Sequence, residues 1–167
     1  EIQKSQNGYI YDFGQNCAGV LELEIKGRKG QRITALHAEV LLNGELFTKP
    51  LRSAKAKLEY VCGGEEETYC PKFTFMGFRY AELCGIEPEN VKVRMKVISS
   101  IDEETGDFFC SNESINRLQK NIRYSGFSNF LEIPTDCPQR DERLGWTGDI
   151  SVFASTACFN FNMNRFL

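Results

Sequence analysis

The stretch Val91-Lys-Val-Arg-Met-Lys-Val97, followed by Ser99-Ser-Ile-Asp-Glu-Glu-Thr-Gly-Asp107, marks the point at which the pattern of the chain changes. Apolar residues occupy every second position of the first stretch, which is typical of a β-strand with one buried and one wet face. The second stretch is polar, acidic and turn-like, without periodicity, as domain boundaries are. The sequence therefore predicts a β domain before this point and a different kind of domain after it.

Upstream of the boundary, residues 1–100 show further strand patterns. Val20–Ile25 alternates apolar and acidic residues, and Ile33–Leu42 is followed by Asn43-Gly44, a strong β-hairpin signal. Glycine-rich turns such as Gly27–Gly30 separate the strands, and no helical periodicity lies between them. This pattern predicts an antiparallel β-sandwich rather than a parallel sheet.

An aromatic run allows two interpretations. Phe73, Phe75, Phe78 and Tyr80 could form a platform for a glycan, or they could belong to the sandwich core. The core is favoured, because Phe73 and Phe75 would share one face of a strand, and the other two would share a face after a break at Gly77.

Helical periodicity appears downstream of the boundary. Ser111 or Asn112 can cap a first helix, and Asp149 can cap a second one. Apolar residues at helical spacing follow each cap: Ile115, Leu118 and Ile122 in the first helix, and Ile150, Phe153, Ala154, Ala157 and Phe161 in the second. We therefore expect a β-sandwich domain over residues 1–100, a linker over 101–110 and a helical domain over 111–167.

Between the two predicted helices lies Pro134-Thr-Asp-Cys-Pro-Gln-Arg-Asp-Glu-Arg-Leu-Gly-Trp-Thr-Gly-Asp149. A charged segment bounded by proline and glycine is usually a solvated loop with weak surface ion pairs. That interpretation does not explain why Trp146, the only tryptophan, lies among charges rather than on an apolar face. Aromatic rings pack on the C–H faces of sugars, while carboxylate and guanidinium groups hydrogen-bond to vicinal hydroxyls. The segment therefore favours a carbohydrate site.

Composition excludes several other functions. The chain is 41% hydrophobic with a net charge of -3 and a pI near 5.4, so neither a nucleic-acid partner nor a membrane is expected. The single histidine, His37, provides neither a metal cluster nor a nucleophile–base pair, and its place in an alternating run favours a structural role. The cysteines are odd in number and form no CxxC pair, which predicts no disulfide framework, no zinc site and a reducing cytoplasm: Cys17, Cys62, Cys70, Cys84, Cys110, Cys137 and Cys158.

The run Asn129–Asp149 resembles the active-site segment of bacterial α-L-rhamnosidases, glycoside hydrolase family 78. Upstream segments resemble the β-sandwich that precedes the catalytic barrel in that family: Tyr11–Asn16, Gly19, His37–Glu39 and Phe73–Tyr80. The resemblance implies a multidomain protein, β then α, with an antiparallel β-sandwich followed by the first helices of an (α/α)₆ barrel. Twelve barrel helices need far more chain than follows residue 100, so we expect a truncated fragment of a bacterial protein. Because the N-terminus would then be cut, secretion stays open beside the cytoplasm.

The resemblance also implies a function. The parent protein would be an inverting glycosidase that releases terminal L-rhamnose from glycosides or polysaccharides, without cofactor or metal. Glu142 falls on the position of the general acid, and four residues fall on rhamnose-contacting positions: Asp136, Arg140, Trp146 and Asp149. The general base would lie beyond Leu167, so the isolated chain should be inactive. The alternative is a non-catalytic carbohydrate-binding or interdomain module of a rhamnosidase-like protein.

The charges around Glu142 leave its acidity open. The three aspartates of the loop would raise the pKa of the glutamate, whereas the two flanking arginines would lower it. The expected partner is a glycoside or oligosaccharide that contains L-rhamnose. Assembly of the protein into a homo-oligomer stays open.

Overall fold

The computed structural model describes residues 1–167 as two compact units. The first comprises Glu1–Val97 together with Gln139–Asp141, and the second comprises Ile98–Pro138 together with Glu142–Leu167. Each unit has its own cluster of buried apolar side chains. Three residues of the charged loop therefore group with the first unit, and the rest of that loop groups with the second.

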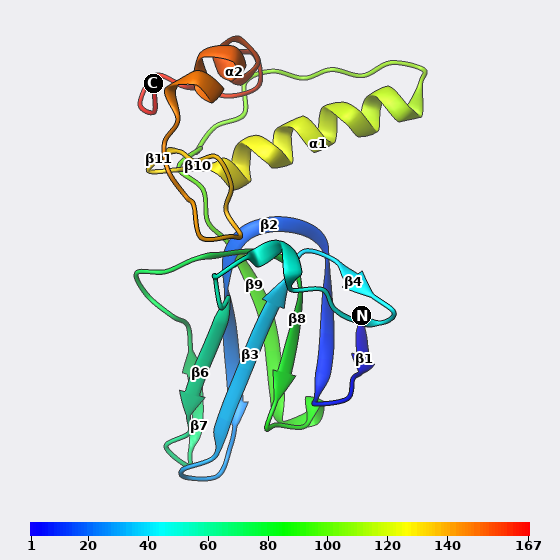
Figure 1. Cartoon of the computed structure of the whole chain (residues 1–167), viewed down its shortest axis with the longest axis vertical. Coiled ribbons are helices and arrows are strands. Elements are labelled where there is room, and N and C mark those ends of the chain that lie inside the picture. The colour runs from blue at the N-terminus through cyan, green and yellow to red at the C-terminus, as the bar shows by residue number, and fades with distance from the viewer. The chain divides into compact units, whose positions relative to one another are not determined.

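The first unit is built from strands. They are β1 (Ile2–Lys4), β2 (Tyr9–Lys26), β3 (Arg32–Ala38), β4 (Leu41–Leu42), β5 (Glu45–Leu46), β6 (Lys57–Val61), β7 (Glu66–Tyr69), β8 (Met76–Cys84) and β9 (Val91–Val97), with short 3₁₀ helices at Lys49–Leu51 and Pro88–Asn90. The main sheet has the order β1-β2-β8-β3-β6, and β7 and β9 also pair with β2 (Figure 1). Every strand pair is antiparallel. The predicted antiparallel, sandwich-like fold is confirmed.

The long strand β2 joins the two sets of strands. Its first half pairs with β8 as far as Gly19, and its second half pairs with β9 from Gly19 to Ile25. The register with β8 shifts between Asp12 and Cys17, where Gly14 has a φ of 80°. Such a bulge bends a strand, and Figure 1 shows β2 arching over one end of the unit. One strand can therefore serve both sides of the core.

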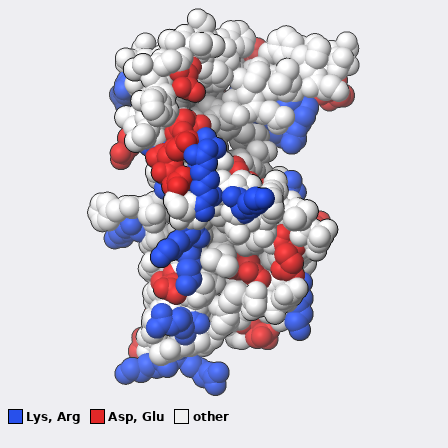
Figure 2. Space-filling model, viewed as in Figure 1, with Lys and Arg blue, Asp and Glu red and all other residues white.

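The two faces of β2 have opposite chemistry. Its inward-facing side chains are fully buried: Leu21, Leu23 and Ile25. On the other face Glu22 pairs with Lys96, and Arg94 pairs with both Glu22 and Glu24 across the β2–β9 register. These contacts hold the pKa of both glutamates below the usual range. Figure 2 shows basic and acidic side chains interspersed over the face of the molecule that it presents.

Gly19 lies where the pairing of β2 changes from β8 to β9, and it has no room for a side chain. A Cβ there would lie 2.3 Å from the backbone oxygen of Lys96. We expect Gly19→Ala to lower the free energy of unfolding of the sandwich by about 1–3 kcal/mol, the usual cost of overpacking. Gly63→Ala is the matched control, because its new Cβ would meet only the carboxylate end of Glu67, at 3.2 Å. Urea denaturation of both variants tests this, and equal midpoints would contradict it.

The predicted hairpin at Asn43-Gly44 is present. Both residues have positive φ, 53° and 82°, as a type I′ turn requires, and β4 pairs with β5 across them. The expected strand Ile33–Leu42, however, is interrupted. Its pairing with β8 ends at Ala38, and β4 begins a separate two-residue ladder at Leu41.

The aromatic run is only partly in the core. Phe78 is fully buried, as predicted, and packs edge-on against Phe13 at 5.7 Å between ring centroids. The prediction for Phe73 and Phe75 is wrong: Phe73 is fully exposed with a φ of 58°, and neither residue lies in a strand. The strand begins only at Met76, where pairing with β2 starts, and it continues through Gly77 without a break.

His37 lies in β3 and is 1% exposed. Its Nδ1–H donates to the carbonyl oxygen of Ala56 at 2.7 Å, and its ring packs edge-on against Phe78. Burial lowers the pKa of His37 from 6.5 to about 4, although the bond to Ala56 opposes that shift. The residue is thus a neutral part of the core.

This burial predicts a pH dependence of stability. The pKa of His37 is lower in the folded state than in the unfolded chain. The stabilisation that comes from burying the neutral imidazole is therefore fully present above pH 6.5 and is lost as the pH falls toward 4. The loss amounts to about 3 kcal/mol. We expect His37→Asn, whose amide can still donate to Ala56, to be less stable at pH 7 but to lose less stability between pH 7 and pH 4. Parallel pH dependences in urea denaturation would refute this.

The second unit contains two helices and a short hairpin: α1 (Glu113–Asn129), β10 (Phe130–Leu131), β11 (Ile133–Pro134) and α2 (Thr147–Asn160). The side chain of Asn112 caps α1 by accepting from the backbone N–H of Ser114 and of Ile115, so one of the two predicted caps is confirmed. The predicted cap of the second helix is wrong. The N-cap of α2 is Trp146, and Asp149 lies inside the first turn, where a negative charge favours the helix dipole. Neither helix has the length and apolar character needed to cross a bilayer.

Aromatic rings form the core of the second unit. Phe161 is 1% exposed and packs against Phe127 and Phe130. Gly126 of α1 allows this, because a Cβ there would lie 2.6 Å from the Phe161 ring. Residues 101–110 run beside the end of α2, where the Thr105 N–H donates to the Asn160 carbonyl at 2.9 Å.

Candidate functional site

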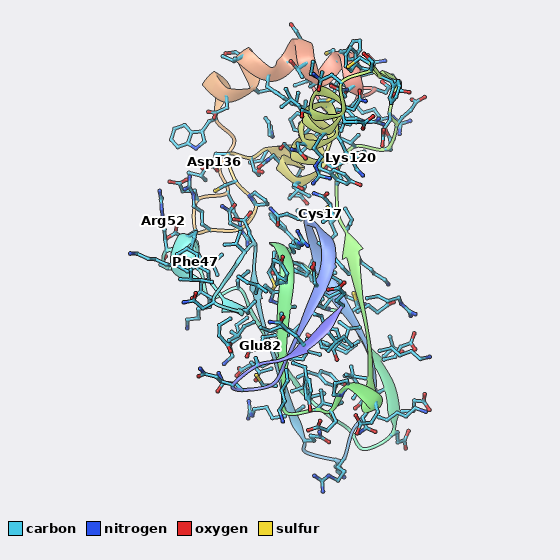
Figure 3. All side chains as sticks on the ribbon, turned by 90° about the vertical axis from the view of Figure 1, so that its right-hand side faces the viewer. Cys17, Phe47, Arg52, Glu82, Lys120 and Asp136 are labelled. Atoms are coloured by element: carbon cyan, nitrogen blue, oxygen red, sulfur yellow. The ribbon has the colours of Figure 1, made fainter.

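The charged loop between β11 and α2 is closed at its base by backbone pairing. Thr135 and Gly145 form an antiparallel bridge, and the Asp136 N–H donates to the Leu144 carbonyl at 3.0 Å. The Leu144 N–H returns a bond to Asp136 Oδ1, also at 3.0 Å. Arg143 adopts a positive φ of 60° next to this pairing. The loop therefore holds Asp136, labelled in Figure 3, by its backbone and its side chain.

Two carboxyl groups and a thiol meet inside this loop. The ligand atoms of Asp136, Cys137 and Glu142 all lie within 4.8 Å of one another. The thiol of Cys137, which is 6% exposed, lies 3.8 Å from Glu142 Oε2. The sequence motif thus brings Asp136 and Glu142 together although five residues separate them.

The environment of Asp136 favours its charged form. Burial by itself would raise its pKa, but hydrogen bonds with Glu142, with the Leu144 N–H and with Cys137 hold the pKa of Asp136 below its usual range. Asp136 is therefore a carboxylate at neutral pH and accepts hydrogen bonds. Arg143 is half-buried, and desolvation lowers its pKa.

Three ligand atoms in such a cluster could contact a metal ion. Structural zinc sites have four protein ligands, and calcium takes six to eight oxygens, so this set is short of either. A carboxyl pair beside a pocket suits acid–base chemistry better, and the expectation of no metal stays a prediction.

A pocket of about 610 Å³ adjoins Asp136. Its wall is formed by the C-terminal end of α1, the start of the charged loop and the N-terminal end of α2: Ser125, Gly126, Asn129, Phe130, Pro134, Thr135, Asp136, Gly148, Asp149, Ile150, Val152 and Phe153. Mostly apolar walls with a few convergent polar groups are typical of small-molecule sites. Asp136 and Asp149 supply two carboxyl groups to this one pocket from different elements.

The remaining predicted residues have different surroundings. Trp146 is 51% exposed at the start of α2 and does not line the pocket. Arg140 is partly buried and groups with the first unit. In that unit the Ser53 hydroxyl donates to Asp141 and thereby lowers the pKa of Asp141.

Cys137 and Asn129 are among the polar residues at this site that the sequence analysis did not single out. The place of Cys137 between Asp136 and Glu142 in the sequence is a signal that could have marked it. Asn129 lines the pocket, and its buried Oδ1 has no hydrogen-bond partner in the structure, whereas its Nδ2 donates to the Ser125 carbonyl. No local sequence signal distinguishes this asparagine from an ordinary residue at a helix end.

Two family profiles match consecutive parts of the chain. The bacterial alpha-L-rhamnosidase concanavalin-like domain matches residues 2–102, and the bacterial alpha-L-rhamnosidase 6 hairpin glycosidase domain matches residues 103–167.

Characterised relatives agree with these matches. An alpha-L-rhamnosidase of Streptomyces avermitilis is 44% identical over 95% of this chain, and one of Formosa agariphila is 41% identical over 99%. The chain spans 16% and 19% of the length of these two proteins.

Solved structures show the same fold. The alpha-L-rhamnosidase of Aspergillus terreus superimposes with a TM-score of 0.90 at 44% identity, over 98% of this chain and 20% of that one. The Streptomyces avermitilis enzyme, solved in complex with L-rhamnose, superimposes with a TM-score of 0.92 at 40% identity, over 98% and 16% respectively. The chain belongs to the bacterial α-L-rhamnosidase family.

Proposed function

We propose that this chain is the sandwich and first barrel part of an inverting α-L-rhamnosidase, and that Glu142 is the general acid. The observation that carries the proposal is the placement of the Glu142 carboxyl next to ionised Asp136, on a loop that borders a pocket for a small ligand. Hydrolysis of a glycosidic bond needs a proton on the leaving oxygen. Glu142 does not line the pocket itself, but its carboxyl lies beside that of Asp136, which does, so it can supply this proton to a sugar bound there.

The general base must come from elsewhere. In inverting glycosidases the acid and the base lie about 6.5–9.5 Å apart, which leaves room for the attacking water. Asp136 and Glu142 are closer than that, with ligand atoms within 4.8 Å, so Asp136 does not serve as the base to Glu142. We assign the base to a part of the complete protein beyond this chain. The isolated chain should accordingly show no turnover.

L-Rhamnose is the proposed ligand of the pocket. The Streptomyces avermitilis relative was solved with this sugar, and its fold covers nearly all of this chain. Asp136 and Asp149 would accept hydrogen bonds from vicinal hydroxyls, and the apolar wall with Phe130 and Phe153 would cover the C–H face and the methyl group of the sugar. Arg140 and Trp146 are proposed as further contacts from the sequence motif alone.

The domain organisation and the cellular compartment are also proposals. We assign residues 1–100 to a sandwich domain, 101–110 to a connecting segment and 111–167 to the start of the catalytic barrel. The odd number and scattered spacing of the seven cysteines favour a reducing cytoplasm.

Proton NMR of the hydrolysis tests the proposed function. The complete protein that contains this chain is incubated with a natural α-L-rhamnoside, and the anomeric signals of the released sugar are followed from the first minutes. An inverting enzyme should release β-L-rhamnose first. Release of the α anomer first would show a retaining enzyme, and saturable binding without release would favour a non-catalytic sugar-binding module.

A further inference from the structure

A buried thiol lies between the two carboxyl groups of the charged loop. Cys137 is 6% exposed, and its Sγ donates toward Glu142 Oε2 over 3.8 Å. The Asp136 carboxylate completes the group, with all three ligand atoms within 4.8 Å. We propose that Cys137 is a positioning residue, which holds the Glu142 carboxyl in the orientation needed to protonate the leaving group. The inference rests on the proposed role of Glu142.

The need for a positioning residue follows from the glutamate side chain. Glutamate has three rotatable bonds, and fixing such a side chain costs up to about 2 kcal/mol of conformational entropy. A proton donor must nevertheless lie within about 3 Å of the oxygen that it protonates. A contact from a buried and rigid neighbour restricts these rotations before the substrate binds, as preorganised sites require.

The position of Cys137 suits this task. The residue follows Asp136 directly, and Asp136 is fixed through two hydrogen bonds with the backbone of Leu144. The thiol therefore starts from an anchored part of the loop and reaches the Glu142 carboxyl. Cys137 is absent from the pocket wall, so it can act on the acid without touching the sugar.

The chemistry of the contact is specific to sulfur. A thiol is a weak donor that contacts an oxygen at 3.5–4.0 Å, whereas a hydroxyl needs about 2.7 Å. Because the Cβ–O bond is shorter than the Cβ–S bond, a serine at position 137 would end farther from Glu142 Oε2 and leave the contact unmade. Alanine would remove the donor altogether.

The test compares Cys137→Ala and Cys137→Ser with Cys158→Ala in the complete protein. Cys158 is exposed on α2 and lines no part of the pocket, which makes it the matched control. Steady-state kinetics are measured on a natural rhamnoside and on p-nitrophenyl α-L-rhamnoside, together with the thermal unfolding midpoint.

We expect both Cys137 variants to lose about tenfold to about a hundredfold in kcat on the natural rhamnoside, the scale of a misplaced catalytic group. KM should stay within about twofold, the loss on the nitrophenyl substrate should be smaller, and Cys158→Ala should match the unmodified protein.

Full kcat on the natural rhamnoside in either folded variant would overturn the proposal. Equal losses on both substrates would also overturn it, because they indicate a general structural defect. If neither variant folds, Cys137 is a packing residue and the proposal is wrong. The Glu142→Gln variant distinguishes failure of the proposed acid from failure of the positioning role. If Glu142→Gln keeps full activity, Glu142 is not the acid. If Glu142→Gln is inactive and the Cys137 variants are fully active, only the positioning role is rejected.

Discussion

Replacement of Glu142 by glutamine in the complete protein is expected to lower kcat/KM for unactivated α-L-rhamnosides by at least about a hundredfold, the usual scale of general-acid assistance. Glutamine keeps the shape of the side chain and its hydrogen bonds to Asp136 and Cys137 can still form, but it carries no transferable proton. The loss should therefore come from chemistry rather than from folding.

The leaving group provides an internal control for this variant. A nitrophenolate needs little protonation to depart, so p-nitrophenyl α-L-rhamnoside should lose much less activity than a natural flavonoid rhamnoside. Glu132→Gln, an exposed glutamate in the same unit that lies outside the cluster of Asp136, Cys137 and Glu142, should behave like the unmodified protein. If Glu142→Gln keeps full activity on the natural substrate, the acid is misassigned, and Asp141 or Asp136 becomes the next candidate.

Removal of the pocket carboxylates should weaken binding of the sugar. Asp136 and Asp149 both line the 610 Å³ pocket, one from the charged loop and one from the first turn of α2. A hydrogen bond to a charged group contributes about 1.5–3 kcal/mol, so Asp136→Ala and Asp149→Ala should each raise KM by about tenfold to about a hundredfold. The effect should be the same for every aglycone, because both residues are proposed to contact rhamnose itself.

Calorimetric titration of L-rhamnose into each variant measures this effect without turnover. Asp107→Ala is the control, since this exposed aspartate lies outside the pocket. Unchanged affinity in both pocket variants would place the sugar elsewhere. A loss that depends on the aglycone would instead assign the carboxylates to the leaving-group side of the site.

Local patterns explain why much of the fold could be predicted. Alternation in Val20–Ile25 and Val91–Val97 depends only on which face of a strand is buried, and both segments lie in strands. The turn at Asn43-Gly44 and the cap at Asn112 likewise depend on the backbone preferences of single residues. The exposed position of Phe73 could not be predicted, because it depends on where β8 begins to pair with β2.

At the site, too, features that depend on local sequence could be predicted, and features that depend on tertiary contacts could not. The loop from Pro134 to Asp149 could be proposed as a sugar site because its composition is unlike that of a packing element. The closeness of Cys137 to Glu142 could not, since it depends on the bridge between Thr135 and Gly145 that folds the loop back. The pocket wall also combines residues of α1 and α2 that only tertiary packing brings together.

The crystal structure of the complete protein with bound L-rhamnose tests the central claim most directly. The account predicts the sugar between Asp136 and Asp149, with a Glu142 carboxyl oxygen within about 3 Å of the anomeric oxygen. Rhamnose bound outside this pocket, or a Glu142 carboxyl turned away from the anomeric oxygen, would contradict it.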